Sequence, residues 1–160
     1  MDPADLAGVV LLDGAGYDVP WVVKQLPSNS GRRRFFEDAF GPRWGELPSS
    51  GKGDEAVRLD RWRDASPQHH IIEGRSYPPM LVVHQGSRWL AACTGGDFVA
   101  ALGRVGGRGR LVPVDKDHVG CNRDLGVPGD ELTVAVAAFL DGLSESTAPD
   151  PPEETTIRSR

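Results

Sequence analysis

The sequence predicts an α/β fold with about three parallel strands and flanking helices. Apolar runs with the length of strands alternate along the chain with segments whose apolar residues recur at helical spacing. The runs are continuously apolar, which is typical of parallel strands covered on both faces, and parallel strands need helical crossovers between them. Twenty glycines and thirteen prolines indicate that much of the remaining chain is loop and turn.

The first half of the chain predicts one strand and two helices. Residues 7–12 form the first apolar run. A helix is expected over residues 32–40 with Phe35, Phe36, Ala39 and Phe40 on one face, ended by Gly41-Pro42. Residues 45–54 have loop composition without periodicity and are expected to be a surface insertion. Residues 55–62 predict another short helix.

The second half predicts two further strands, each followed by a helix. Residues 80–84 follow two prolines that set the start of a strand, and residues 110–114 contain Pro113, which favours a sheet edge. A helix over residues 89–102 would bury Leu90, Cys93, Phe98, Ala101 and Leu102, although Gly95-Gly96 weakens that prediction.

The last predicted elements are a loop over residues 115–129 and a helix. Asp130 is expected to cap the helix, which extends to about residue 143 with Leu132, Val136, Phe139, Leu140 and Leu143 on one stripe. Residues 144–160 are rich in Pro, Glu, Ser and Thr, and we expect a disordered tail there. Residues 1–143 would then form one partial domain.

Composition and charge restrict the kinds of binding partner that the chain is expected to have and the cellular compartment in which it is expected. A formal charge of −5 and a pI near 5.3 argue against nucleic acid, and Arg32-Arg33-Arg34 is interpreted as the solvated side of a helix. No stretch approaches the roughly 18 apolar residues that cross a membrane. The acidic start lacks a secretion signal, so we expect a cytoplasmic protein in which Cys93 and Cys121 are unpaired thiols.

His118 is the first candidate for chemistry. It lies four residues beyond the third predicted strand, in Asp117-His118-Val119-Gly120, just ahead of the last helix. Sites in open α/β sheets gather beyond the carboxyl ends of the strands, and a histidine titrates close to neutral pH. The alternative is a surface histidine between two acidic residues.

Four segments together resemble an α/β-hydrolase, with bacterial carboxylesterases and lipase-like proteins as the nearest branch. They are Leu11-Leu12-Asp13-Gly14-Ala15-Gly16-Tyr17-Asp18-Val19-Pro20, Trp62-Arg63-Asp64-Ala65-Ser66-Pro67, Pro78-Pro79-Met80-Leu81-Val82-Val83-His84, and Asp117-His118 with Asn122-Arg123-Asp124-Leu125-Gly126. They occur in the order that this family uses for its last three strands and cover roughly residues 5–143. The resemblance therefore implies the C-terminal part of an α/β-hydrolase fold.

The resemblance implies a Ser-His-Asp triad of which this chain carries only part. The family's serine lies in G-x-S-x-G between a strand and a helix, and this sequence contains no such motif. The nearest contexts are Asn29-Ser30-Gly31 and Gln85-Gly86-Ser87-Arg88. The family places its serine and its oxyanion loop upstream of the strand that here starts at Ala7, so the chain is expected to begin after the nucleophile. His118 matches the catalytic histidine and would be the general base.

The position of the acid stays open. Family members usually carry it just past the second of these strands, where this chain has no carboxylate before Asp97. Asp13, past the first strand, is the alternative acid, because some relatives take theirs from there. Asp13 is equally well explained as a turn residue before Gly14.

The remaining histidines and the glycine-rich segments do not predict a further site. His84 is interpreted as a strand-end residue with a satisfied ring. His69-His70 suggests a metal pair only superficially, because adjacent side chains point apart and no other ligand completes a set. Gly51-Lys52-Gly53 lacks the rest of a phosphate loop. We expect neither a metal nor a cofactor.

The leading hypothesis is the C-terminal portion of a serine ester hydrolase that supplies the catalytic histidine and is inactive alone. Its partners would be a small ester substrate and a missing N-terminal half, or further copies of itself through the unpaired edge of the first strand. The alternatives are a non-catalytic degenerate fragment or binding module, and a split enzyme whose serine lies on a separate chain.

Overall fold

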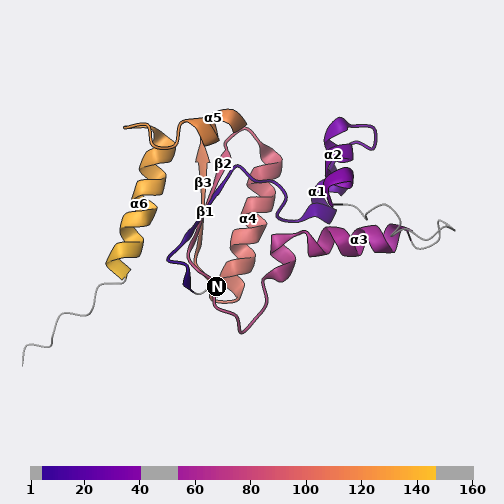
Figure 1. Cartoon of the computed structure of the whole chain (residues 1–160), viewed down its shortest axis with the longest axis horizontal. Coiled ribbons are helices and arrows are strands. Elements are labelled where there is room, and N and C mark those ends of the chain that lie inside the picture. Colours follow the sequence, from indigo (N-terminus) through magenta and orange to yellow (C-terminus); the bar gives the residue numbers. More distant parts are fainter. Residues whose placement is uncertain (1–4, 41–53, 147–160) are drawn as a thin grey trace, which may run out of the picture.

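The computed structural model describes residues 5–40 and 54–146 and has three layers (Figure 1). A parallel sheet is formed by β1 (Val9–Leu12), β2 (Met80–Gln85) and β3 (Gly109–Val114). Helix α6 (Glu131–Ser146) covers one face of the sheet and α4 (Trp89–Arg104) covers the other. Helices α1 (Val19–Gln25), α2 (Gly31–Phe40) and α3 (Asp54–Asp64) lie beyond α4. The predicted α/β class with three parallel strands is confirmed.

The strand order is β1-β2-β3, so β2 is the central strand. Leu11 pairs with Val82, which in turn pairs with Leu111. Pro113 lies in an edge strand, as predicted, because an edge strand tolerates the missing N–H. β1 differs from its prediction: it starts at Val9 instead of Ala7, and its four residues are only partly buried. Within the described residues its second edge has no partner strand.

Each face of the sheet has its own apolar core. Side chains on one face pack with α6, and their most buried members are Leu81, Val83, Val114, Cys121 and Leu132. Those on the other face pack with α4, and they include Tyr17, Val82, Phe98 and Leu102. Because the sheet is buried on both faces, the apolar segments that form β2 and β3 show little alternation of apolar and polar residues.

Gly95 explains how α4 remains a helix despite its glycine pair. A Cβ at Gly95 would lie 3.0 Å from the Leu111 side chain and 3.2 Å from that of Val82. The glycine therefore allows the helix to approach the sheet closely, and this packing offsets its weak helix propensity. The prediction that Cys93 shares the buried face is wrong, because Cys93 is exposed.

Helix α1 was not predicted, because it is short and contains a proline. Asp18 caps it by accepting a hydrogen bond from the Trp21 amide at 3.1 Å, and Pro20 is tolerated in its first turn. The buried Ser66 hydroxyl accepts from the Val19 amide at 2.8 Å and donates to the Trp62 carbonyl at 2.5 Å. Ser66 thereby links α1 to the end of α3.

The other helices correct details of the predictions. In α2, Phe36 is buried while Phe35 is 63% exposed and Ala39 is exposed, so the four expected residues do not share one buried face. Leu140 is likewise exposed on α6. The expected loop 115–129 contains a helix, α5 (His118–Arg123). Asp130 caps α6 as predicted, accepting from the Leu132 amide at 3.0 Å.

Two predicted segments lie largely outside the described residues. These are the surface insertion over 45–54, of which only Asp54 is described, and the tail over 144–160, of which α6 takes the first three residues. Within the described parts of the chain, no helix has both the length and the apolar character to cross a bilayer.

Candidate active site

Three polar side chains converge where the strands end. Asp13 follows β1, Arg88 lies between β2 and α4, and His118 begins α5 just after β3. In a parallel sheet the carboxyl ends of all strands meet at one edge, where open α/β sheets bind their ligands. The sheet therefore brings together residues that are far apart in the sequence.

Asp13 and His118, the two predicted site residues, are in direct contact. Oδ2 of Asp13 lies 2.8 Å from Nδ1 of His118. The carboxylate is fully buried, whereas the His118 side chain is 62% exposed. A carboxylate accepts hydrogen bonds, so in the neutral ring Nδ1 carries the proton and Nε2 keeps its lone pair. This orientation is the one that a general base requires.

The backbone of Asp13 has a left-handed conformation, with φ of 46°. Asp and Asn adopt this conformation more readily than other residues with a side chain, and such conformations cluster at functional sites. The Asp13 amide still donates to the Val83 carbonyl at 2.7 Å, so β1 keeps its pairing with β2 up to this residue. The backbone turns away from the sheet immediately afterwards.

The Asp13 carboxylate accepts hydrogen bonds from three groups. The Gln85 amide donates to Oδ1 at 3.0 Å, while His118 and Arg88 both donate to Oδ2. Burial alone would raise the pKa of Asp13, but these hydrogen bonds and the charge of Arg88 outweigh it and hold the pKa below its usual value. Asp13 is therefore ionised at neutral pH although it is buried.

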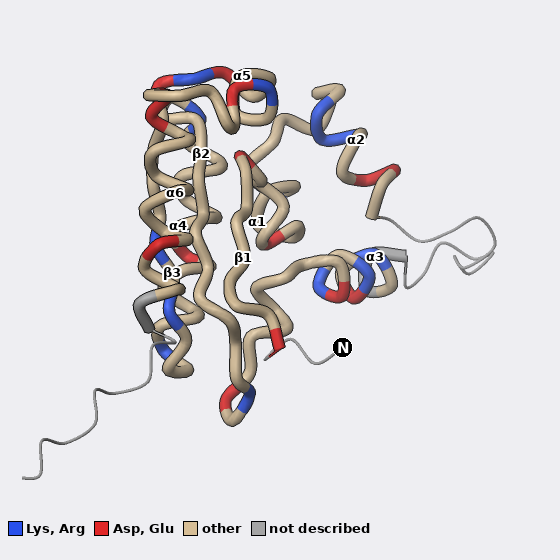
Figure 2. Tube along the Cα trace, turned by 60° about the vertical axis from the view of Figure 1, so that its left-hand side comes forward, with Lys and Arg blue, Asp and Glu red and all other residues tan. Residues whose placement is uncertain are grey.

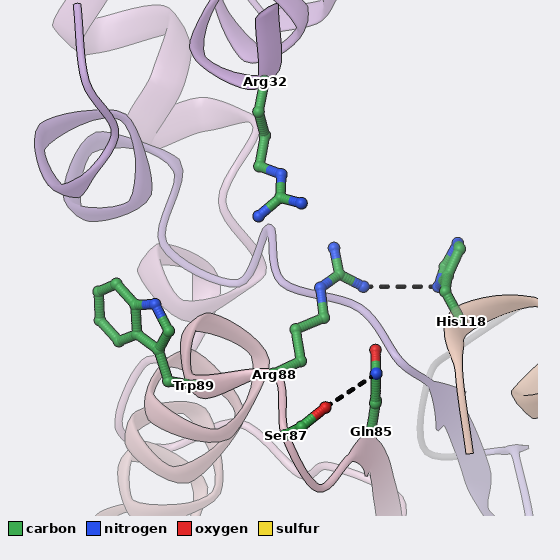
Figure 3. Close-up of a pocket in the computed structure, with 6 residues that line it drawn as sticks. All are labelled: Arg32, Gln85, Ser87, Arg88, Trp89 and His118. Atoms are coloured by element: carbon green, nitrogen blue, oxygen red, sulfur yellow. Dashed lines mark hydrogen bonds between the residues drawn. The ribbon is translucent and has the colours of Figure 1, made fainter. Parts of the chain in front are cut away.

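Arg88 binds the same oxygen of Asp13 that His118 contacts. Its Nη1 lies 2.7 Å from Oδ2 and 3.1 Å from the main-chain oxygen of Asp13. The same Nη1 lies 3.4 Å from Nδ1 of His118 (Figure 3). Nδ1 cannot donate to Asp13 and accept from Arg88 at once, and the shorter contact with the carboxylate sets the tautomer. Arg88 thus compensates the buried charge.

The loop that carries His118 is fixed by a cap and by ion pairs. Asp117 accepts from the Gly120 amide at 2.6 Å and so begins α5 at His118. Lys116 Nζ lies 3.0 Å from Asp124 and 2.5 Å from Asp130, which joins this loop to the start of α6. Figure 2 shows acidic and basic residues alternating along this segment. Hydrogen bonds from Arg123 and Lys116 lower the pKa of Asp124 to about 2.

A pocket of about 360 Å³ opens beside His118 (Figure 3). Its walls come from three parts of the chain, and the lining residues are Arg32, Gln85, Ser87, Arg88, Trp89 and His118. The volume lies in the range of small-molecule sites. A substrate in this pocket would lie next to the exposed imidazole.

The other residues considered from the sequence lie apart from this contact. Asp97, the first carboxylate after β2, is exposed on α4, the helix in which it was expected. His84 is buried with Nδ1 2.9 Å from the Gln85 carbonyl, which agrees with a strand-end residue whose ring is satisfied. His69 lies 3.7 Å from Asp18, and His70 contacts the Asp64 carbonyl. Among the described residues no group of three or more His, Cys, Asp and Glu could hold a metal.

Sequence reasoning missed Arg88 as part of the site. The only available signal was its position directly after β2, which puts it at the same sheet edge as Asp13 and His118.

Comparisons with known proteins do not identify the chain. No family model matches it, and no curated protein or solved structure is significantly similar to it. The arrangement of the site is therefore the basis for the functional argument.

Proposed function

We propose that the chain is the C-terminal portion of a serine ester hydrolase with an α/β-hydrolase fold, and that it supplies the histidine and the carboxylate. The observation that carries this proposal is the 2.8 Å contact between Asp13 and the outward-facing His118. The same contact supports Asp13 as the acid. The order of Asp13 before His118, at the carboxyl ends of the two outer strands of a parallel sheet, suits this class of enzyme.

In the proposed reaction, His118 Nε2 accepts the proton of a serine hydroxyl as the serine attacks the carbonyl carbon of a small carboxylic ester. The resulting imidazolium then gives this proton to the leaving alcohol, which leaves an acyl-serine. Nε2 next takes a proton from a water that attacks the acyl carbon, and it returns this proton to the serine oxygen as the carboxylic acid leaves. Asp13 keeps Nδ1 protonated and stabilises the imidazolium, and it stays ionised throughout. Arg88 and the Gln85 amide hold Asp13 in place.

The serine would come from another segment or chain. Ser87 lines the pocket, but its Oγ accepts from Gln85 Nε2 at 2.9 Å, and within the described residues it makes no hydrogen bond to His118. Figure 3 shows Ser87 and the imidazole on opposite sides of Gln85. A cytoplasmic setting suits the two free thiols, Cys93 and Cys121.

The first test uses the purified 160-residue chain. It should not hydrolyse p-nitrophenyl acetate through a serine, and a fluorophosphonate probe should label none of its serines. Ser87→Ala should behave like the wild-type chain. Phosphonate-sensitive hydrolysis that Ser87→Ala abolishes would show that the nucleophile lies on this chain and would contradict the proposal.

The second test supplies the serine. The DNA upstream of the Met1 codon is read in all frames for a segment with G-x-S-x-G, and that segment is co-expressed with this chain. Hydrolysis should appear and should fall by on the order of 10³-fold or more in His118→Ala, because a triad acts as a unit. A co-expressed pair whose hydrolysis is unaffected by His118→Ala would exclude the role of His118.

The absence of G-x-S-x-G favours a second candidate, a non-catalytic binding module that uses the same pocket. A binding module predicts no coding segment for a serine elbow upstream and no hydrolysis with any co-expressed segment. Ligand binding in the pocket would nevertheless persist.

A further inference from the structure

The pocket beside His118 has a strongly one-sided charge. Two arginines line it, and none of its lining residues is acidic. Figure 3 shows the Arg32 guanidinium pointing from the start of α2 toward the guanidinium of Arg88. Like charges that face one another repel, and a bound anion between them would remove that repulsion.

Of the two arginines that line the pocket, Arg32 is the one whose charge the described residues leave unbalanced. Arg88 is paired with Asp13, and Arg33, the neighbour of Arg32, is paired with Glu37 at 2.9 Å. Within residues 5–40 and 54–146, Arg32 has neither an ion pair nor a hydrogen bond from its side chain. In the same part of the chain, Arg88 uses only Nη1, so its Nη2 and Nε remain available to a ligand.

The rest of the lining favours a small organic anion. Trp89 is 54% exposed and gives the same pocket an apolar ring surface. Arg88 is also the N-cap residue of α4 and makes no side-chain hydrogen bond to the first turn of that helix. The first turn therefore adds a partial positive charge next to the arginines.

We infer that this pocket binds an oxyanion, a carboxylate or a phosphate group, carried by the substrate, with Arg32 as the main anchor and Arg88 as the second. The inference rests on the proposed function and specifies its substrate class as an anionic ester. The ester group would lie near His118 Nε2, and the charged end would lie between the two guanidiniums. Arg32 is then a specificity-determining residue on α2.

An NMR titration of the ¹⁵N-labelled 160-residue chain tests the inference with two matched probes. Monomethyl succinate is an ester with one carboxylate, and dimethyl succinate is its neutral counterpart. The anionic probe should shift the signals of the Trp89 indole, Ser87 and Gln85, and it should bind at least about tenfold more tightly than the neutral one. Equal binding of the two probes, or shifts elsewhere only, would overturn the inference.

Variants on α2 supply the control. Arg32→Met should weaken binding of monomethyl succinate about tenfold or more, while Arg34→Met, an exposed arginine of the same helix that does not line the pocket, should leave it unchanged. An equal loss of binding in both variants would show that only the net charge of the protein matters, and it would overturn the inference. Inorganic phosphate, titrated in parallel, distinguishes the source of the oxyanion. Binding of phosphate without monomethyl succinate would support a phosphate-bearing ligand.

These measurements need no turnover. If the anion binds as expected and the co-expressed enzyme shows no hydrolysis, the pocket inference stands and the proposed function fails. If hydrolysis depends on His118 but anionic and neutral esters react equally well, the proposed function stands and the oxyanion inference fails.

Discussion

Oδ2 of Asp13 lies 2.8 Å from Nδ1 of His118, although the two residues are 105 positions apart in the sequence. They follow the two outer strands of the sheet, and the loop after the central strand contributes Arg88 between them. The contact is thus set by the whole sheet and involves a buried carboxylate with three hydrogen-bond donors. Its consequences are open to measurement in the chain itself.

Substituting Asp13 should change the tautomer of His118. In the wild-type chain, long-range ¹H–¹⁵N NMR should show a protonated Nδ1 and an unprotonated Nε2 when the ring is neutral. In Asp13→Asn, which keeps a residue suited to the positive φ, the preference for this tautomer should be lost, because the side chain carries no charge to hold the Nδ1 proton. Asp97→Asn on α4 is the matched control. A tautomer that responds to Asp97→Asn and not to Asp13→Asn would reassign the acid.

Removing Arg88 should destabilise the fold. Arg88→Met leaves the buried Asp13 carboxylate with one charged hydrogen bond fewer, and we expect a loss of about 1–3 kcal/mol in the free energy of unfolding. Urea denaturation at pH 7 measures it. Arg104→Met, at the other end of α4, should change this free energy by no more than about 0.5 kcal/mol. Equal effects of the two variants would show that Arg88 does not compensate Asp13.

The ion pairs around Lys116 predict how stability varies with pH. The pKa of Asp124 is lowered to about 2, and those of Asp13 and Asp130 are lowered as well, so these carboxyls stabilise the fold fully above the ordinary pKa of 3.8. Their contribution is lost as the pH falls from about 4 toward 2, because the unfolded chain takes up protons first. Hydrogen bonds with Asp130 and Asp124 raise the pKa of Lys116, so its contribution is complete below 10.5 and is lost at higher pH.

The urea concentration at the midpoint of unfolding, plotted against pH between 2 and 11, should therefore be constant at intermediate pH and lower at both ends. Lys116→Met should lower the plateau and flatten both flanks. Lys24→Met, on α1, should leave the shape of the curve unchanged. A curve for Lys116→Met that runs parallel to the wild-type curve at every pH would contradict the assignment of these flanks to Lys116.

The second edge of β1 predicts self-association. The amides of Val9 and Asp13 donate to the carbonyls of Pro79, just before β2, and Val83 in β2. Successive residues of a strand point to opposite sides, so the Val10 amide faces the other edge. We expect concentration-dependent oligomers by light scattering. Val10→Pro removes that donor without breaking a bond to β2 and should reduce association, whereas Val10→Ala, which loses the side chain only, should not.

The light-scattering experiment also has a clear negative outcome. A wild-type chain that stays monomeric up to high micromolar concentration and unfolds reversibly would show that the β1 edge does not drive association. Association that persists unchanged in Val10→Pro would place the contact elsewhere on the surface.

The sequence predicted those parts of the fold that depend on local pattern. The apolar runs located all three strands, Pro113 indicated an edge, and Asp130 indicated the start of α6. The missed helix α1, and the glycine pair that weakened the prediction of α4, both depend on contacts distant in sequence. Helix α1 is held by Ser66, and α4 tolerates Gly95 because the sheet needs a close approach at Leu111 and Val82. Neither contact can be recognised from the residues next to it in the chain.

Only part of the candidate site could be predicted, because its residues are also far apart in the sequence. The position of His118 after a strand identified it. Spacing alone explained Asp13 equally well as a turn residue, because only the strand order determines which carboxyl reaches the imidazole. Arg88 gave no signal of its own, since the burial of Asp13 creates the need for a compensating charge.

The position of the Asp13–His118 contact also limits how far the chain can be truncated from either end. Its two partners lie near opposite ends of the described sequence, one after each outer strand, so removing either terminal strand would separate them. A truncated chain that begins after residue 13 or stops before residue 118 could retain helices and still lose this contact entirely. The His118 ring signal would then serve as a single-site reporter of whether all three strands have assembled, from the first to the last.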